Sequence, residues 1–379
     1  MNRKDIAEIK KQFSPENCAI TRISGCYVDH EKNMSMTEES AFLSLSEEEN
    51  FKYYELFRKT LSGTVGKNLL NMEFPLEQEA EGGTQEFLLK LRDSKLQDPQ
   101  LLESFYNKVV ENYYYAENYY IILVHAMYDI PGKSSDGAEM FDASDEVYEY
   151  ILCSICPVNL SKAALCYNAA HNRVEDRIRD WLVEPPLQGF LFPAFADRGS
   201  DIHHVLYYSK KAEEIQTEFI DQVLGSAQPL TAGTQKDSFN AIIADTLGDD
   251  GDYEIIKSIH ENLNEIIEEN KEEPEPLELT STDVKKIFEQ SGVPQERMEP
   301  FEERYKELAG ERGKLLASNI ASPKKFNIET PDIVIRVNPD RADLIETRII
   351  DDKQCLVIAV DDHIEVNGVN VRTIRKHED

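Results

Sequence analysis

Long apolar runs, a secretion signal and a cysteine framework are all missing from this sequence. The longest apolar run, 119–127, contains a histidine and is far shorter than the ~20 residues that a membrane-spanning helix needs. Residues 1–13 mix charged and apolar side chains, whereas a signal peptide has an uninterrupted apolar stretch. Six cysteines spread over 379 residues favour reduced thiols over disulfides. We therefore expect a cytoplasmic protein that does not enter membranes.

Positive charge is also scarce, because 41 basic residues stand against 72 acidic ones and the net charge is −31. Such a charge repels polyanions, so any nucleic-acid contact is expected to be weak and local. Three small basic clusters are candidates for such a contact: Arg173, Arg177 and Arg179; Lys324 and Lys325; and Arg372, Arg375 and Lys376. Each cluster also fits a solvated face that nearby acids balance, and both interpretations stay open.

What the sequence does contain is an alternation of strand-like and helix-like segments. Residues 18–28 predict an early strand, and helical spacing predicts helices at 45–60, 84–96 and 99–112. In the first helix, Ser46 is the predicted N-cap. The predicted buried stripe of this helix is Phe51, Tyr54, Leu56 and Phe57.

Short apolar runs in the middle of the chain predict a central sheet, which we expect to be mixed rather than all parallel. These runs are 119–128, 148–156, 189–195 and 203–208. A polar loop is predicted at 131–145 and a helix at 170–181.

A helical section is predicted from residue 210 onward, and its helices are 210–224, 235–247 and 252–269. The last helix carries an apolar stripe that fits either the core or a partner. The acidic, proline-containing stretch 268–280 is the predicted linker. We therefore predict an α+β fold with a body at 1–268 and a second part at 281–379.

The second part begins with predicted helices at 280–290 and 295–308, the first of them capped by Thr280 and Asp283. A C-terminal β segment follows, in which Asn367 and Gly368 form a hairpin turn. Its predicted strands are 332–337, 344–350, 355–360 and 364–374.

Two glycine-lysine fragments fail as phosphate-binding loops. Residues 62–68 (SGTVGKN) have two residues between the glycines where four are needed, so we interpret them as a helix end and turn. The fragment PGKS at 131–134 lacks the first glycine. Nucleotide hydrolysis is therefore not predicted.

Metal sites also fail on spacing. Cys153 and Cys156 form a CxxC pair, but their distance to Cys166 and His171 matches no standard zinc ribbon, and an apolar strand favours buried thiols. The acidic stretch 249–252 lacks the glutamate of a calcium loop and is interpreted as a helix cap. We predict no metal and no cofactor.

Asp201, His203 and His204 are the best candidates for acid–base chemistry. Adjacent strand residues point to opposite faces, so only one of the two histidines can join a given site. We expect one histidine on each face without a catalytic role.

Two stretches, 60–79 (TLSGTVGKNLLNMEFPLEQE) and 360–379 (VDDHIEVNGVNVRTIRKHED), resemble the signature of an uncharacterised family from mostly anaerobic Gram-positive bacteria. More distantly, the order of segments resembles the nucleoid-associated proteins of the NdpA and YejK type. That resemblance rests on 209–225, with Lys211, Phe219, Leu224 and Gly225, and on 346–360. Neither family transfers a catalytic residue to this chain.

The leading functional hypothesis is a non-enzymatic nucleoid-associated or DNA-metabolism adaptor that acts mainly through protein partners. Its acidic surface disfavours DNA coating, while small basic patches still permit local contacts. The alternatives are an enzyme of unrecognised type, with a site at the central sheet that includes Asp201 and a histidine, and a structural homo-oligomer.

Overall fold

The computed structural model describes residues 1–36, 40–133, 139–248, 252–310, 313–321, 326–338, 341, 344–360, 364–366 and 369–371. These residues form two compact units. The first unit consists of Met1–Ala232 and Pro274–Pro276, and the second of Gly233–Glu273 and Leu277–Asp379. The units divide after Ala232, which is N-terminal to the linker predicted at 268–280.

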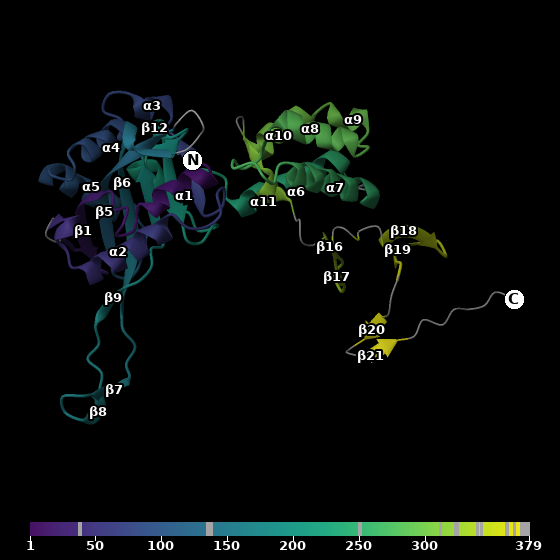
Figure 1. Cartoon of the computed structure of the whole chain (residues 1–379). Coiled ribbons are helices and arrows are strands. Elements are labelled where there is room, and N and C mark those ends of the chain that lie inside the picture. Colours follow the sequence, from purple (N-terminus) through teal and green to yellow (C-terminus); the bar gives the residue numbers. More distant parts are fainter. Residues whose placement is uncertain are drawn as a thin grey trace. The chain divides into compact units, whose positions relative to one another are not determined.

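The first unit is built around a nine-stranded sheet with the order β2-β1-β5-β6-β10-β13-β4; β3 also pairs with β1 and β9 with β6 (Figure 1). Every pair of strands in the described part of this sheet is antiparallel. The predicted α+β class is thus confirmed, but the sheet is not mixed. The strands are β1 (Ile20–Val28), β2 (Met34–Met36), β3 (Ser40–Ala41), β4 (Leu69–Glu73), β5 (Tyr119–Lys133), β6 (Glu139–Leu160), β9 (Trp181–Val183), β10 (Gln188–Phe192) and β13 (His204–Ser209).

Both faces of the central strands are buried, which explains their uninterrupted apolar sequences. Successive strand residues point to opposite faces. Accordingly, Ile121 and Leu123 of β5 pack in one core, and Ile122 and Val124 pack in the other. The strands β5 and β6 continue through most of 131–145, so the loop predicted there is wrong outside 134–138, which are not described.

Helices cover the two faces of the sheet. One core contains apolar residues of α4 (Thr84–Asp93), α5 (Pro99–Asn112) and the π-helical turn η2 (Phe219–Val223). The other core contains residues of α1 (Arg3–Lys11) and α2 (Glu47–Thr60). The remaining short elements are η1 (Phe42–Ser44), α3 (Leu76–Glu79), β11 (Ala194–Ala196) and β12 (Gly199–Asp201).

The start of α2 was predicted from local sequence and is confirmed. The Ser46 side chain accepts the backbone N–H of Glu49, and the Glu49 carboxylate accepts the backbone N–H of Ser46 in return. These contacts satisfy two amides that a helix start otherwise leaves unpaired. Tyr54 and Phe57 are buried as predicted, whereas Phe51 is 48% exposed and lies outside the buried stripe.

The helix predicted at 170–181 is wrong, because this segment forms part of a β-hairpin. Strands β7 (Leu165–Asn168) and β8 (Arg173–Asp176) pair antiparallel, with Tyr167 opposite Val174. The Asn168 side chain accepts the backbone N–H groups of Ala170 and His171. The Asn168 side chain thereby satisfies backbone N–H groups that would otherwise form hydrogen bonds within a helix, and this favours a turn.

Of the helix predicted at 210–224, only 217–223 is helical, and this part ends with η2. Upstream of η2, the backbone is held by the sheet: the carbonyl of Glu214 accepts the amide of Gln188, and the Tyr207 hydroxyl accepts the backbone N–H of Gln216. These tertiary hydrogen bonds use groups that a helix would pair internally. Gly225, with φ +61°, ends the turn as predicted.

The second unit contains a helical core. Its helices are α6 (Ala232–Leu247), α7 (Tyr253–Glu269), α8 (Ser281–Gln290), α9 (Gln295–Met298), α10 (Phe301–Ala309) and α11 (Ala317–Ile320). Asp252 caps α7 and Thr280 caps α8, both as predicted, while 249–251 lie outside the described residues. Only Ile259 and Leu263 of the α7 stripe are fully buried. The helix predicted at 295–308 is divided at Pro300, which lacks a backbone N–H.

Short antiparallel pairs complete the second unit. They are β14 (Glu278–Leu279) with β15 (Leu315–Leu316), β16 (Phe326–Glu329) with β17 (Val334–Val337), β18 (Ile345–Ile350) with β19 (Lys353–Ile358), and β20 (Ile364–Val366) with β21 (Val369–Val371). The predicted turn after Ile350 is confirmed, with Asp351 and Asp352 at positive φ. Val366 pairs with Val369, and the predicted turn residues 367–368 lie outside the described part.

Candidate functional site

The basic residues predicted to touch nucleic acid do not form an open cluster. Arg173 is 2.7 Å from the Glu175 carboxylate, and Arg179 donates to the carbonyl of Ser161 at 2.6 Å. The Arg177 side chain makes no hydrogen bond or ion pair with the described residues, unlike those of Arg173 and Arg179. The other two predicted clusters, Lys324 with Lys325 and Arg372 with Arg375 and Lys376, lie outside the described part of the chain.

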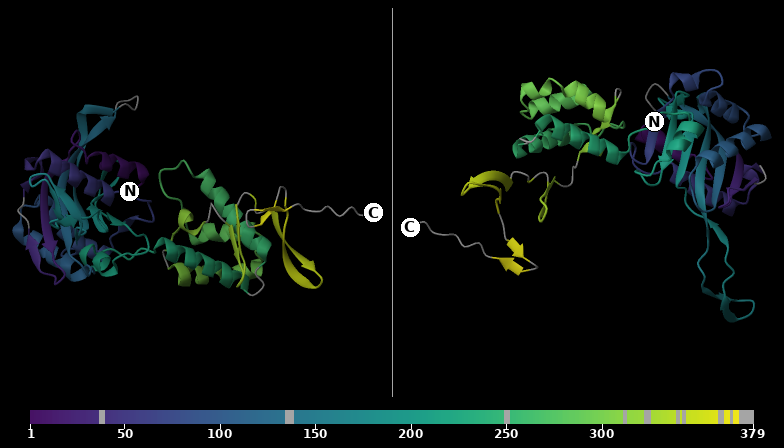
Figure 2. Two further views of the ribbon diagram at one scale, coloured as in Figure 1. Left: turned by 90° about the horizontal axis from the view of Figure 1, so that it is seen from below. Right: turned by 180° about the vertical axis from the view of Figure 1, so that it is seen from behind.

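These three arginines lie on a feature that the sequence did not predict, a β-ribbon that projects from the first unit (Figures 1 and 2). We call residues 161–180 the arm. It leaves the sheet at the end of β6, passes through β7 and β8, and returns at β9. Its base is closed by backbone hydrogen bonds from Ser161 to Asp180 and from Arg177 to Ala164.

One face of the arm exposes three apolar side chains, with Asp176 opposite Leu165 on the same face, and we call it the apolar face. Leu165 and Tyr167 point to the same side of β7, and Val174 lies opposite Tyr167. Their exposed fractions are 75%, 63% and 63%. The other face is polar, because the Asn168 amide and the Arg173 guanidinium both donate to Glu175. A two-stranded ribbon with an uncovered apolar face is marginally stable in water by itself, so this face is suited to contact with another molecule.

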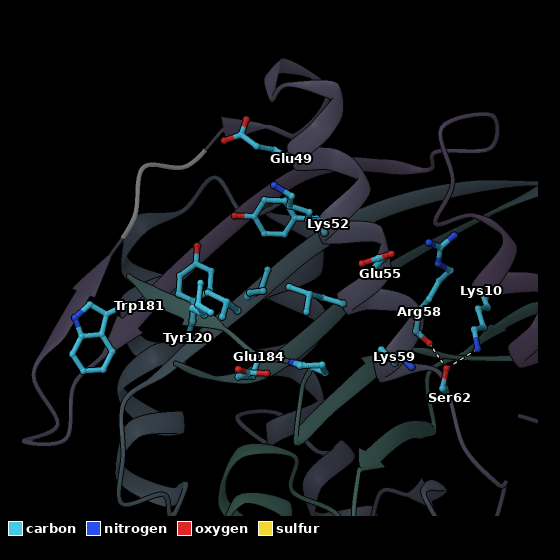
Figure 3. Close-up of a pocket in the computed structure, with 16 residues that line it drawn as sticks. Lys10, Glu49, Lys52, Glu55, Arg58, Lys59, Ser62, Tyr120, Trp181 and Glu184 are labelled. Carbon is cyan, nitrogen blue, oxygen red and sulfur yellow. Dashed lines mark hydrogen bonds between the residues drawn. The ribbon is translucent and has the colours of Figure 1, made fainter. Parts of the chain in front are cut away.

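The base of the arm borders a groove of about 1000 Å³ (Figure 3). One wall is α2, and the other is β9 with the two residues that follow it. Tyr120 and Ile122 of β5 contribute to its lining. Trp181, the only tryptophan of the chain, lines this groove and is 57% exposed.

Three basic side chains gather at one end of the groove. They are Lys10 at the end of α1 and Arg58 and Lys59 at the end of α2 (Figure 3). Lys10 Nζ donates to Ser62 Oγ at 2.6 Å, and Ser62 Oγ donates to the carbonyl of Arg58. Burial lowers the pKa of Lys10, and repulsion by Lys59 and Arg58 lowers it further. Within the described residues, none of the three is ion-paired with a carboxylate.

The histidines predicted to take part in chemistry are held by separate carboxylates. His203 Nδ1 is 2.7 Å from Glu79 Oε1, and His204 Nδ1 is 2.8 Å from Asp201 Oδ2. The hydrogen bond with Glu79 raises the pKa of His203, because it favours the protonated imidazole. The two imidazoles therefore do not share a partner.

A histidine that the sequence analysis did not single out has the more organised surroundings. His125 of β5 is fully buried, with Nδ1 2.6 Å from Thr21 Oγ1 and Nε2 2.8 Å from Glu149 Oε1. The Glu149 carboxylate can only accept a hydrogen bond, so Nε2 of His125 carries a proton and donates it. In the neutral ring, Nδ1 is unprotonated and accepts a hydrogen bond from the Thr21 hydroxyl. The network joins β1, β5 and β6 through a side chain that solvent does not reach.

The remaining motifs are structural. Cys153 and Cys156 lie in β6 but pack in different cores, one on each face of the sheet, so they cannot bind one metal ion together. Burial raises the pKa of both thiols. Among the described residues, no group of three or more His, Cys, Asp or Glu side chains is placed to hold a metal ion.

The two phosphate-loop fragments are also part of ordinary backbone structure. In 62–68, the backbone N–H groups of Gly66 and Lys67 donate to the carbonyls of Leu69 and Thr64, so they do not face a ligand. The segment is a turn after the end of α2, as predicted. In the second fragment, Gly132 lies in β5 and pairs with Met140 of β6.

A family model described as "Domain of unknown function (DUF4317)" matches residues 1–369, which is almost the whole chain. The chain belongs to this family. The stretches 60–79 and 360–379 predicted an uncharacterised family, and the match to a domain of unknown function confirms this prediction. No curated protein and no solved structure matches the chain, and the resemblance to nucleoid-associated proteins is therefore not supported. No described helix of this family member is long and apolar enough to cross a membrane.

The arm and the groove were missed for different reasons. The arm left only a weak signal in the sequence, because its strands β7 and β8 have four residues each and lack a regular alternation of apolar and polar side chains. The groove left none, since its basic end combines residues of α1 and α2 with a wall from β9, which are far apart in the chain.

Proposed function

We propose that this protein is a non-enzymatic adaptor that binds a protein partner through the apolar face of the arm, in the setting of DNA metabolism. The observation that carries the protein-binding part is the exposed face of Leu165, Tyr167 and Val174 on a ribbon that projects from the first unit. Exposed apolar side chains of this kind typically mark a contact surface.

The charge of the whole chain favours a protein partner over nucleic acid, and the charge of the arm indicates the chemistry of that partner. The arm has four basic and three acidic residues, so its net charge is +1 in a chain of net charge −31. Two of its arginines are engaged by Glu175 and by the Ser161 carbonyl, which leaves Arg177 for an external contact. The partner that fits is a protein surface with an apolar patch bordered by carboxylates.

The DNA-metabolism part of the proposal is carried over from the sequence-based hypothesis and has no support from the comparisons. The net charge of the chain determines how such an association could occur. Because the chain repels polyanions, association with chromosomal material should pass through the protein partner and persist at physiological salt. Any direct binding to naked DNA should be weak and should fade as salt rises, since phosphate contacts release counterions.

The test is a photocrosslinking amino acid at Leu165, in the full chain expressed in its native cells, with and without nuclease. The expected result is crosslinking to a discrete partner that nuclease does not remove and that the double variant Tyr167→Ser, Val174→Ser abolishes. The matched control is Leu43→Ser, Leu76→Ser, which removes apolar side chains that are 71% and 85% exposed elsewhere in the first unit. These control substitutions should leave the crosslink intact.

Two outcomes would contradict the proposal. Crosslinks only between copies of this chain would point to the structural homo-oligomer instead. Loss of the partner on nuclease treatment would show that nucleic acid, and not the apolar face, holds the complex together.

A further inference from the structure

The groove beside α2 combines features that are unusual on so acidic a chain. At one end, Lys10, Arg58 and Lys59 lie close enough for the last two to lower the pKa of the first. Such mutual repulsion costs stability in the free protein. An anion bound among them would relieve the repulsion and accept charge-assisted hydrogen bonds.

The other end of the groove contains aromatic side chains, together with Lys52 and Glu49 of α2. Trp181 and Tyr120 lie there, away from the basic end (Figure 3), and Tyr53 of α2 lines the same groove. Exposed indole and phenol rings stack on planar ligands, and a base stacked on an aromatic ring typically contributes about 1–3 kcal/mol. A ring system bound there would cover the tryptophan, which is 57% exposed in the free chain.

Two carboxylates, Glu55 of α2 and Glu184 after β9, lie between the ends (Figure 3). Ionised carboxylates only accept hydrogen bonds, so the middle of the ligand should offer hydroxyl or amino groups. The groove volume of about 1000 Å³ is at the upper end of the usual range for small-molecule sites.

We propose that this groove binds a free nucleoside phosphate, with the phosphate at Lys10, Arg58 and Lys59, the sugar hydroxyls at Glu55 and Glu184, and the base against Trp181. A planar ring, a hydroxylated middle and an anionic end occur in this order in such a molecule. Along the groove, the aromatic, carboxylate and basic side chains follow one another in the same order. The site lies outside the apolar face of the arm, so this inference does not depend on the adaptor function.

A free nucleotide fits better than a nucleic-acid strand. The net charge of −31 opposes a polyanion much more strongly than a ligand with a few charges. The carboxylates of Glu49, Glu55 and Glu184 along the groove would also repel a continuous phosphate backbone.

The test uses the fluorescence of Trp181, which is the only tryptophan and therefore reports on this groove alone. The purified full chain is titrated with ATP, GTP, CTP and UTP, then with adenosine, with pyrophosphate and with a ten-nucleotide single strand. At least one nucleotide should change the emission saturably. Adenosine and pyrophosphate should bind at least about tenfold more weakly, because each lacks one of the two anchoring groups.

Charge-neutralising variants locate the phosphate. Arg58→Gln and Lys59→Gln should each weaken the nucleotide affinity about tenfold, the size expected for one charge-assisted hydrogen bond. Lys4→Gln is the matched control: it removes the same charge from an exposed position of α1 that does not line the groove, and it should leave the affinity unchanged. Circular dichroism checks that each variant is folded. If Arg58→Gln does not fold, Lys59→Gln still tests the proposal, because Lys59 is exposed.

Three results would overturn the inference. One is that no nucleotide changes the emission up to millimolar concentration. Another is that Lys4→Gln weakens binding as much as Lys59→Gln, which would indicate attraction by overall charge only. The third is that the single strand binds more tightly than every nucleotide, which would make the groove a nucleic-acid surface.

Discussion

At the residue scale, His125 shows how a polar side chain can be held inside an apolar sheet. Its two ring nitrogens contact Thr21 on β1 and Glu149 on β6, so the imidazole is fully hydrogen-bonded although it is buried. Burial lowers the pKa of His125, and this outweighs the opposite effect of Glu149. The folded protein therefore favours the neutral ring.

This shift predicts a pH-dependent stability. Because the folded-state pKa is below the unfolded value of about 6.5, the contribution of His125 is complete above that pH and is lost as the pH falls through it. We expect the free energy of unfolding to decrease between pH 7.5 and pH 5 more steeply in the wild type than in His125→Gln. At pH 7.5 the variant should be less stable by about 1–3 kcal/mol. Denaturant unfolding across this pH range measures both effects.

The control for this experiment is His30→Gln, at an exposed turn position. It should reproduce the wild-type pH dependence. If the free energy of unfolding of His125→Gln depended on pH as steeply as that of the wild type, the buried imidazole would not contribute to the pH dependence of stability.

At the scale of elements, two caps predicted from local sequence, at the starts of α2 and α8, are both present. The reciprocal hydrogen bonds of Ser46 with Glu49, and of Thr280 with Asp283, are local and do not depend on the rest of the fold. The arm is the opposite case. Its residues form strands only because they continue the hydrogen-bonded pairing that β6 and β9 begin.

The cap of α2 can be tested directly. Ser46→Ala should destabilise the protein by about 1 kcal/mol, because the N–H of Glu49 loses its acceptor. Thermal and denaturant unfolding measure the change. Ser44→Ala, two residues earlier in η1, removes only an exposed hydrogen bond from the hydroxyl to the Ala41 carbonyl and should cost less than about 0.5 kcal/mol. Equal effects of the two substitutions would contradict a specific role for the cap.

At the scale of the whole molecule, the acidic stretch 268–280 stays the predicted site of an exposed linker. Its residues 271–273 are exposed, whereas the carbonyl of Pro274 accepts the backbone N–H of Arg3. The helices on either side of the stretch belong to one unit, since Asn262 of α7 donates to Ser291 and Phe239 of α6 packs against Phe288 of α8.

This arrangement predicts the outcome of limited proteolysis. Early cleavage should fall within 268–280, at the exposed and charged residues 271–273, because such backbone is accessible to proteases. The two fragments should still elute together under native conditions and separate only in denaturant, because α7 remains packed on α8. Mass spectrometry and size-exclusion chromatography test both points. Resistance of 268–280 would contradict the linker, and a free fragment 1–268 would contradict the helix packing.

The sequence by itself determined the α+β class, the central strands, the helix caps and the turns with glycine or aspartate at positive φ. These features depend on side chains within a few residues of one another, or on apolar runs that are buried wherever they pack. The tertiary structure alone decided the rest. The segment 210–216 is not helical because Gln188 and Tyr207 bind its backbone. The groove exists because α1, α2 and β9 meet around it. Contacts between distant segments leave no periodicity in the chain, so local patterns did not predict them.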